Sequence, residues 1–432
     1  MINKSNPKPR FYYGWVIVIV AIVAGAFAPG ISIWSTGILL PPMVDNFDWS
    51  RSEFMMALTI RWLTSAAIAP WIGPILDQPN GPRRLMSISA SALGLSMIGL
   101  YFIDDGLIPV DLIDSRVQFY LLFGIIGGAA QMGAGMTIGQ TVLPKWFIKR
   151  RGRVLGIAAI GSAVGPFVFP PVVNLIVENL GFRWAWVALG VATIVILLPL
   201  SFLVRTQPED MGLLPDNEEI AGEEENVENK DGEISFTRKE AMRTPTFWVL
   251  MLAFGMVGLG LSGYHTNWQA FLTEPPISFA AQTAALGVSF YAIFSMSARV
   301  IWGSLGDKFH PKKLIVIGMF GTSASILFML TIDSVSDLLI FGIFHGLTIG
   351  SFFILEPLLI ARYFGRKHLG AIFGIFRPAM MITGSLSPLM VGILYDSRGS
   401  YTLAFIIVAC VWAIAASMVF LVSSPKPPQS VN

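Results

Sequence analysis

Three arginines lie inside long apolar stretches of the chain, at Arg61, Arg299 and Arg377. Placing a guanidinium in hydrocarbon costs about 2.5–3.5 kcal/mol, so such residues commonly mark a functional site. The planar guanidinium presents a fork of N–H donors that matches a carboxylate through two parallel hydrogen bonds. We therefore interpret Arg299 and Arg377 as a candidate anion-binding pair. A structural tie to backbone carbonyls or to Glu356 is the alternative.

The depth of the two arginines favours this pairing. Arg299 precedes Asp307 by eight residues, and Arg377 follows His368 by nine. At 1.5 Å per residue, both lie about 12–13 Å from the same edge of the apolar region, near its middle. Two like charges at one level repel each other unless an anion or polar solvent lies between them. Ser295, one helical turn before Arg299, is expected to line this site.

Other polar residues in the apolar stretches are candidates for supporting roles. His265 and His345 titrate near neutral pH, and Glu356 can accept a proton, so each is a candidate for proton coupling. Packing histidines and a structural carboxylate are the alternative interpretation. The remaining candidates are Arg61 as a gate residue near the outer mouth, Asn267 as a substrate contact, and Gln131 and Gln140 along the path.

The composition indicates an integral membrane protein. Of 432 residues, 54% are hydrophobic and 13% are charged, whereas soluble proteins carry about 25% charged residues. Apolar stretches of about twenty residues recur, and each can span a bilayer core as a helix. The twelve predicted helices cover residues 14–40, 53–76, 84–103, 118–142, 153–177, 183–204, 246–271, 281–304, 313–331, 337–361, 369–394 and 401–423.

Several classes of function find no support in the sequence. A net charge of +2 gives no reason to expect a nucleic-acid partner, and the single cysteine, Cys410, allows no disulfide within the chain. No Ser-His-Asp set, metal-ligand cluster or phosphate loop is evident. We therefore expect a monomeric protein without enzymatic activity, metal or cofactor.

The distribution of basic residues predicts the orientation in the membrane. With the N-terminus in the cytoplasm, 22 of the 29 Lys and Arg residues fall in cytoplasmic segments, four fall outside and three lie within the membrane. This excess agrees with the positive-inside rule. Both termini are therefore predicted to be cytoplasmic, in a multi-pass protein of the inner (plasma) membrane.

A polar segment divides the chain into two halves. Residues 205–244 contain NEEIAGEEENVENKDGE, which is acidic, lacks aromatic residues and has no helical periodicity. Such a composition is typical of a flexible linker. The predicted domains are therefore residues 1–204 and 245–432, with six helices in each and a cytoplasmic linker between them.

The two halves repeat each other. GPILDQPNGPRRL (73–85) follows the second predicted helix, and GSLGDKFHPKKL (303–314) follows the eighth. WFIKRRGRVLGI (146–157) follows the fourth, and YFGRKHLGAIFGI (363–375) follows the tenth. Matching patterns at matching places favour the parallel repeats of a secondary transporter.

The whole chain resembles the major facilitator superfamily through these loop motifs. The residues that carry the first copy are Gly73, Asp77, Gly81, Arg83 and Arg84, and those of the second are Gly303, Asp307, Lys312 and Lys313. The resemblance implies two pseudo-symmetric six-helix bundles. It also makes Asp77, Arg83, Arg84 and Asp307 candidates for a latch that holds the cytoplasmic side closed until the halves rock.

Within this superfamily, the chain is most similar to the branch of monocarboxylate transporters and oxalate:formate antiporters. The similarity rests on Tyr13-Gly14-Trp15, residues 146–166 and Arg299. The chain also departs from both families. The antiporters have a lysine at the position of Arg377, and the monocarboxylate transporters have an acidic residue at the position of Ser295 and a lysine in the first helix.

The loop motif has departures of its own. One extra residue separates Asp77 from Gly81, and His310 stands where the second copy would have its turn glycine.

These features predict a secondary active transporter of small organic anions, foremost monocarboxylates, by alternating access. Arg299 and Arg377 are expected to bind the carboxylate near the midplane. Proton symport is the first interpretation of the energy coupling, and organic-anion exchange is the alternative. A non-transporting membrane sensor on the same scaffold is a further alternative. The expected partners are a small carboxylate, a proton or counter-anion, and the lipid bilayer.

Overall fold

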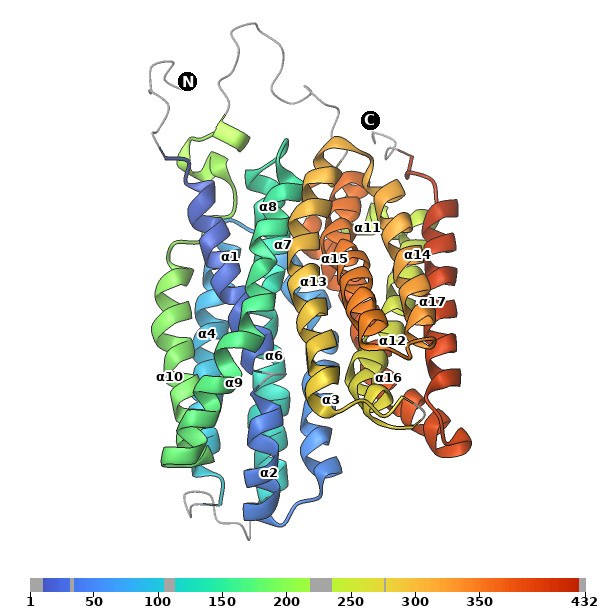
Figure 1. The fold of residues 1–432 in the computed structure, drawn as a ribbon. Coiled ribbons are helices and arrows are strands. Elements are labelled where there is room, and N and C mark those ends of the chain that lie inside the picture. Colours follow the sequence, from blue (N-terminus) through green and yellow to red (C-terminus); the bar gives the residue numbers. More distant parts are fainter. Residues whose placement is uncertain (1–10, 32–34, 105–112, 218–234, 276, 427–432) are drawn as a thin grey trace, which may run out of the picture. The chain divides into compact units, whose positions relative to one another are not determined.

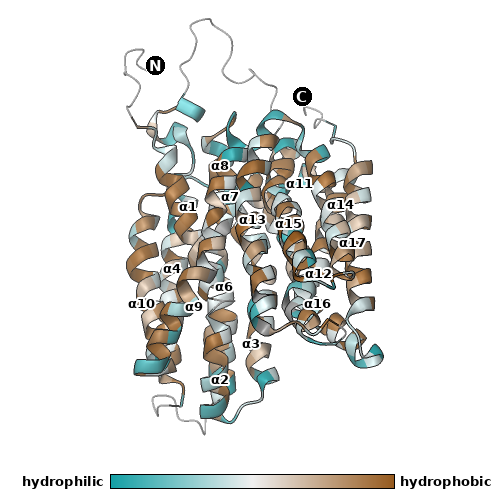
Figure 2. Ribbon diagram, viewed as in Figure 1, coloured by the Kyte–Doolittle hydropathy of each residue, from teal (hydrophilic) through white to brown (hydrophobic). Residues whose placement is uncertain are grey.

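The computed structural model describes residues 11–31, 35–104, 113–217, 235–275 and 277–426. Nearly all of these residues lie in helices, which confirms the predicted all-α class (Figure 1). Among them, 11 helical segments are long and apolar enough to cross a membrane. Figure 2 shows hydrophobic residues along the helices and hydrophilic residues gathered at their ends, the pattern that a membrane-spanning helix requires.

The chain divides into two compact units. Unit 1 comprises Met1–Lys149 and Ala158–Gly232, and unit 2 comprises Arg150–Ile157 and Glu233–Asn432. The helices of unit 1 are α1 (Gly14–Pro29), α2 (Thr36–Phe47), α3 (Arg51–Leu76), α4 (Gly81–Gly99), α5 (Ser115–Phe119), α6 (Gly127–Ala134), α7 (Met136–Trp146), α9 (Ile160–Leu180) and α10 (Phe182–Ser201). The helices of unit 2 are α8 (Arg151–Ala158, through Ile157), α11 (Arg238–Met242), α12 (Pro245–Thr273), α13 (Ala281–Lys308), α14 (Pro311–Met329), α15 (Val335–Phe364), α16 (Leu369–Arg398) and α17 (Thr402–Leu421).

The predicted domain boundaries at residues 204 and 245 stay predictions. Much of the acidic linker lies outside the described residues, which omit 218–234.

The internal repeat is visible as one pattern of helix packing inside each unit. In unit 1, α1 packs against α9, α3 against α6, and α4 against α10. In unit 2, α12 packs against α16, α13 against α15, and α14 against α17. Each half therefore pairs its first span with its fifth, its second with its fourth and its third with its sixth. This agreement confirms two bundles of matching architecture.

Two predicted helices are interrupted, and a third is described only in part. The stretch predicted as one helix over 14–40 contains α1 and α2, and residues 32–34 between them lie outside the described residues. The stretch over 118–142 contains a π-helix (Tyr120–Ile126), and Gly135 adopts extended backbone between α6 and α7. The stretch over 153–177 divides into α8 and α9 at Ala159.

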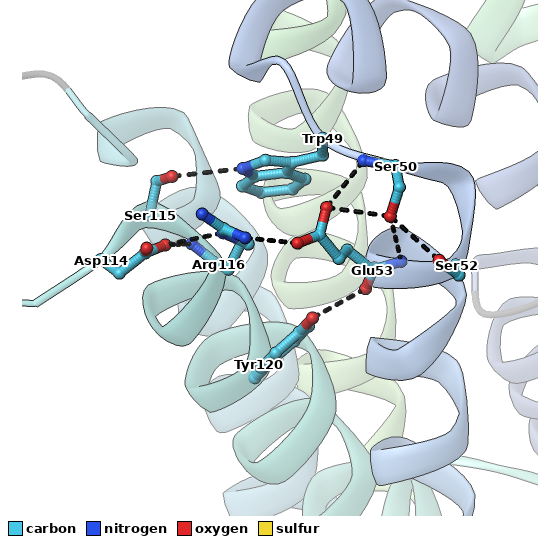
Figure 3. Close-up of polar contacts among 8 residues, drawn as sticks. All are labelled: Trp49, Ser50, Ser52, Glu53, Asp114, Ser115, Arg116 and Tyr120. Atoms are coloured by element: carbon cyan, nitrogen blue, oxygen red, sulfur yellow. Dashed lines mark hydrogen bonds and ion pairs between the residues drawn. The ribbon is translucent and has the colours of Figure 1, made fainter.

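A polar cluster joins the start of α3 to the start of α5 in unit 1 (Figure 3). Ser50 caps α3 and forms a capping box with Glu53. The Glu53 carboxylate pairs with Arg116, which also pairs with Asp114 at 3.2 Å. The Tyr120 hydroxyl donates to the Glu53 carbonyl at 3.0 Å. Because its charged side chains are 30–49% exposed, these ion pairs add little stability, and they link the two helix ends.

Glycines bring α13 and α15 of unit 2 into direct backbone contact. A Cβ on Gly346 would lie 2.7 Å from the Tyr291 carbonyl oxygen and 2.9 Å from the Ser295 amide nitrogen. A Cβ on Gly350 would lie 2.8 Å from the Ser295 carbonyl oxygen. Small residues four apart are the usual means by which membrane helices approach this closely. They hold the face of α13 that carries Arg299 against α15.

Candidate functional site

One turn of α15 contacts both predicted anion-binding arginines of unit 2. The Arg299 guanidinium, from α13, lies over the Phe353 ring at 5.2 Å from its centroid. Arg377, from α16, pairs with the Glu356 carboxylate at 3.4 Å. Phe353 and Glu356 are three residues apart, a rise of about 4.5 Å along α15. Both arginines therefore reach nearly the same level of this helix.

Arg299 is buried in the packing around α13, with 8% of its surface exposed. A Cβ on Gly156 of α8 would lie 2.5 Å from the Arg299 carbonyl oxygen, so α8 also contacts α13 closely at this point. Ser295 is buried one turn earlier, and Tyr291 lies one turn before Ser295. Because residues four apart share a helix face, these three side chains form one polar row on α13.

Arg377 and Glu356 form an ion pair with little exposure, at 15% and 5% of the two side chains. The Arg377 guanidinium also lies 5.3 Å from the Phe373 ring centroid. This pair corresponds to the structural tie that the sequence leaves open for Arg377. A guanidinium can still exchange one carboxylate for another, because both are bound through the same fork of donors.

His265 of α12 connects the polar row of α13 to a neighbouring helix. Its Nδ1 lies 2.8 Å from the Leu261 carbonyl oxygen, and its Nε2 lies 3.0 Å from the Tyr291 hydroxyl. A carbonyl oxygen only accepts hydrogen bonds, so Nδ1 carries the proton and donates to Leu261. Nε2 is then the acceptor of the Tyr291 hydroxyl and the atom that an added proton would occupy.

His345 is a packed core residue with no exposed surface. Its Nδ1 lies 2.8 Å from the Ser325 hydroxyl, and its ring stacks on Phe341 and Tyr291. The His265 ring lies 5.6 Å away, centroid to centroid. The two predicted histidines are thus brought together, and both contact Tyr291 of the polar row: His345 through its ring, and His265 through a hydrogen bond.

The loop residues hold helix ends together. Asp77 pairs with Lys145 of α7 at 2.9 Å, Arg83 lies 5.0 Å from the Phe202 ring centroid, and Arg84 is exposed. In unit 2, the Asp307 carboxylate accepts from the backbone amides of Gly152 at 2.6 Å and Arg153 at 2.9 Å. A carboxylate at these amides complements the positive end of the α8 dipole.

His310 explains one departure from the loop motif. It is the N-cap of α14, where its side chain accepts from the Lys312 amide at 3.2 Å. A capping side chain therefore occupies the position at which the motif would have a turn glycine.

The remaining predicted residues lie apart from the turn of α15. Asn267 donates to the Gly263 carbonyl at 2.8 Å within α12. Arg61 lies in unit 1, where it contacts Gln131. The structure also brings in Tyr291, Phe353 and Phe373, which the sequence patterns do not single out. Tyr291 could have been found from the sequence, because Tyr291, Ser295 and Arg299 follow one another at intervals of four residues.

Comparisons with known proteins identify the class. The chain is 25% identical over 409 residues to the oxalate:formate antiporter of Oxalobacter formigenes, covering 94% of this chain and 90% of that protein. It is 25% identical over 452 residues to human monocarboxylate transporter 12, covering 97% and 81%. The solved structure of the proton:xylose symporter XylE superposes with a TM-score of 0.70 at 15% identity, covering 94% and 95%. The fold and these relatives define a multi-pass membrane transporter rather than an enzyme.

The family model named Major Facilitator Superfamily matches residues 22–274 and 264–432. The chain therefore belongs to this superfamily. The resemblance to the superfamily, and to its branch of monocarboxylate and oxalate:formate transporters, is confirmed.

Proposed function

We propose that the protein carries small organic anions, foremost monocarboxylates, by alternating access coupled to proton symport. Arg299 and Arg377 bind the substrate carboxylate. The observation that carries this proposal is the convergence of both guanidiniums on one turn of α15 at Phe353 and Glu356. Ser295 and Asn267 are the neutral polar residues proposed to assist, and the curated relatives include carboxylate transporters by name.

The charges near α15 favour a substrate with one negative charge. Arg299 and Arg377 each carry a positive charge, and Glu356 carries a negative charge that offsets that of Arg377. When all three are ionised, they hold one net positive charge. A monocarboxylate neutralises this charge, whereas a dicarboxylate would leave an excess negative charge in an environment of low dielectric constant. As long as Glu356 stays ionised, neutralisation by the substrate would in turn favour an occluded state.

Glu356 is the group that we propose takes up the coupled proton. A substrate carboxylate that binds Arg377 removes the counter-ion of Glu356. A buried carboxylate without a counter-ion is costly, so protonation of Glu356 becomes favourable. One anion and one proton would then cross together. His265 is the second candidate, because its Nε2 faces the Tyr291 hydroxyl of the same polar row.

The contacts at the loop motifs support a role in gating. Asp307 holds the amides of Gly152 and Arg153, and Asp77 holds Lys145. Breaking such charge-assisted contacts would release helix ends when the transporter changes state.

We further propose that the protein acts as a monomer in the inner (plasma) membrane. Both termini are proposed to lie in the cytoplasm, because the predicted cytoplasmic segments carry the excess of basic residues.

Anion exchange is the alternative coupling. Ser295 occupies the turn before Arg299, so no acidic side chain stands at that position to take a proton. The similarity to an oxalate:formate antiporter favours the same alternative. In that case an outgoing anion, rather than a proton, would neutralise the charge of the arginines while the site returns to its starting orientation.

Transport by purified protein in liposomes distinguishes these possibilities. We expect uptake of labelled monocarboxylates to rise when the outside is made acidic, in the absence of any internal anion. Uptake that requires an internal carboxylate and ignores the pH gradient would establish exchange instead. Saturable binding without flux in either direction would indicate a sensor and contradict the transport proposal.

A further inference from the structure

Arg61 of unit 1 is a buried cation, and only some of its N–H groups form hydrogen bonds to described residues. Only 1% of its surface is exposed. Its Nε donates to the Gln131 side-chain carbonyl at 2.8 Å, and its Nη1 donates to the Phe123 backbone carbonyl at 3.0 Å. The Phe123 ring lies 4.5 Å from the guanidinium carbon. Among the residues that the structure describes, Nη2 has no hydrogen-bond partner.

Local backbone features position this guanidinium. Phe123 lies in the π-helix Tyr120–Ile126, a rare conformation that often occurs at functional sites. A Cβ on Gly127 would clash with Nη1 of Arg61, and a Cβ on Gly128 would lie 2.5 Å from the Arg61 carbonyl oxygen. The two glycines therefore make room for the arginine. The cluster in Figure 3 fixes the beginning of the same pair of helical segments.

The charge of Arg61 is not balanced by the described part of unit 1. Its contacts there are an amide oxygen, a backbone carbonyl and an aromatic ring, and none of the described carboxylates pairs with it. A buried charge without a counter-ion is costly, and at membrane depth such residues commonly mark an ion or substrate path. An anion from solution would remove this cost.

The neighbouring Gln131 offers a second donor. Its side-chain oxygen accepts the hydrogen bond from Arg61. Its NH₂ group can therefore donate hydrogen bonds to a different partner. Gln131 is only half-buried, so part of this pair of side chains lies at the surface of unit 1. Nη2 of Arg61 and the Gln131 amide are thus two N–H donors on one connected pair of side chains.

We infer that Arg61 and Gln131 form a second anion site, contained within unit 1, for a small monovalent anion such as formate or chloride. Binding there does not involve Arg299 or Arg377. If the proposed function holds, the same site is a second station for the substrate carboxylate. The anion chemistry itself does not depend on that function.

The test measures melting temperatures of the purified full-length protein with sodium formate or sodium chloride at constant ionic strength. Arg299→Gln removes the first proposed site. In this background we expect a saturable rise in Tm of roughly 2–4 °C, because a ligand that binds the folded state stabilises it. Gln131→Glu in the same background should abolish the rise, since the new carboxylate would pair with Arg61 from inside the protein.

The substitution Gln131→Glu should also raise the Tm in the absence of added anion, which shows that the variant folds. Gln78→Glu is the matched control, because Gln78 is exposed in the loop between α3 and α4, and it should leave the anion effect unchanged. A rise with formate alone assigns the site to carboxylates, and a rise with both salts assigns it to small anions in general.

An anion effect that persists undiminished in Arg299→Gln/Gln131→Glu, or that is already absent in Arg299→Gln, would overturn the second site. If instead Gln131→Glu alone abolishes the entire formate effect and Arg299→Gln changes nothing, the second site stands and the role proposed for Arg299 fails.

Discussion

Glu356 and Arg377 meet in an ion pair whose charges are largely hidden from solvent. Buried ion pairs contribute little net stability, because the cost of desolvation offsets much of the attraction. Their charges are therefore available for exchange with a ligand of the same chemistry. The proposed cycle uses this property, with the substrate replacing Glu356 at Arg377.

Replacing Glu356 by Gln should separate anion binding from proton coupling. The variant cannot take up the proton, so we expect carboxylate counterflow to persist while accumulation driven by a pH gradient is lost. The site would also hold two positive charges, which should favour a dicarboxylate such as oxalate over formate by roughly 10–100-fold relative to the native protein. Uptake assays in liposomes with both substrates measure these changes.

Glu178→Gln provides the control, because Glu178 is an exposed carboxylate on α9. Undiminished pH-driven accumulation by Glu356→Gln would exclude Glu356 as the proton acceptor and turn attention to His265.

The sequence predicts the arginines but not all of their partners. A charge inside an apolar stretch is conspicuous, so Arg299, Arg377 and Glu356 can be singled out without a structure. Phe353 and Phe373 are ordinary in a chain with 31 phenylalanines, and only their placement beside a guanidinium distinguishes them. The hydrogen bond between His265 and Tyr291 joins two different helices. Residue spacing within a single helix cannot predict a contact of this kind.

Among the helices, α13 and α15 of unit 2 determine the geometry around Arg299. Their backbones touch through Gly346 and Gly350. This contact places Phe353 under the guanidinium and Tyr291 beside His345. The separation of these two helices is therefore coupled to the position of the proposed carboxylate site.

Substituting Gly346 by Ala should disturb both stability and binding. The added Cβ would lie within 3.0 Å of backbone atoms of α13, so the helices must separate. Overpacking of this kind costs about 1–3 kcal/mol. We expect a lower Tm and weaker carboxylate binding, measured by thermal unfolding and by titration.

Gly392→Ala is a matched control on α16, since no atom lies within 4 Å of a Cβ at that position. It should leave binding intact and keep or raise the Tm, because alanine favours a helix over glycine. Equal effects of the two substitutions would show that the helix contact does not control the site.

The helix pattern was largely predictable, and its interruptions were not. Apolar stretches long enough to cross a membrane locate the helices, because hydrocarbon requires every backbone group to be bonded internally. The π-helix at Tyr120–Ile126 and the extended Gly135 depend on contacts with α3 and α4 that no local pattern encodes.

For the whole molecule, the repeat of helix packing in both units explains why the loop motifs recur at matching places. The four charged candidates that lie inside apolar stretches do not follow this repeat. Unit 2 holds Arg299, Arg377 and Glu356, whereas unit 1 holds Arg61. The proposed substrate site thus belongs to one repeat, and a comparison of arginine variants across the chain can locate it.

Transport by Arg299→Ala tests the proposed carboxylate site most directly. The measurement is uptake of a panel of labelled monocarboxylates by liposomes containing the native protein, Arg299→Ala, or the control Arg398→Ala at the exposed end of α16. Loss of a charge-assisted contact predicts uptake reduced by roughly 10–100-fold for every substrate, with the control unaffected and the variant still folded by its thermal unfolding. Native rates of uptake by Arg299→Ala for every carboxylate would contradict the proposed site.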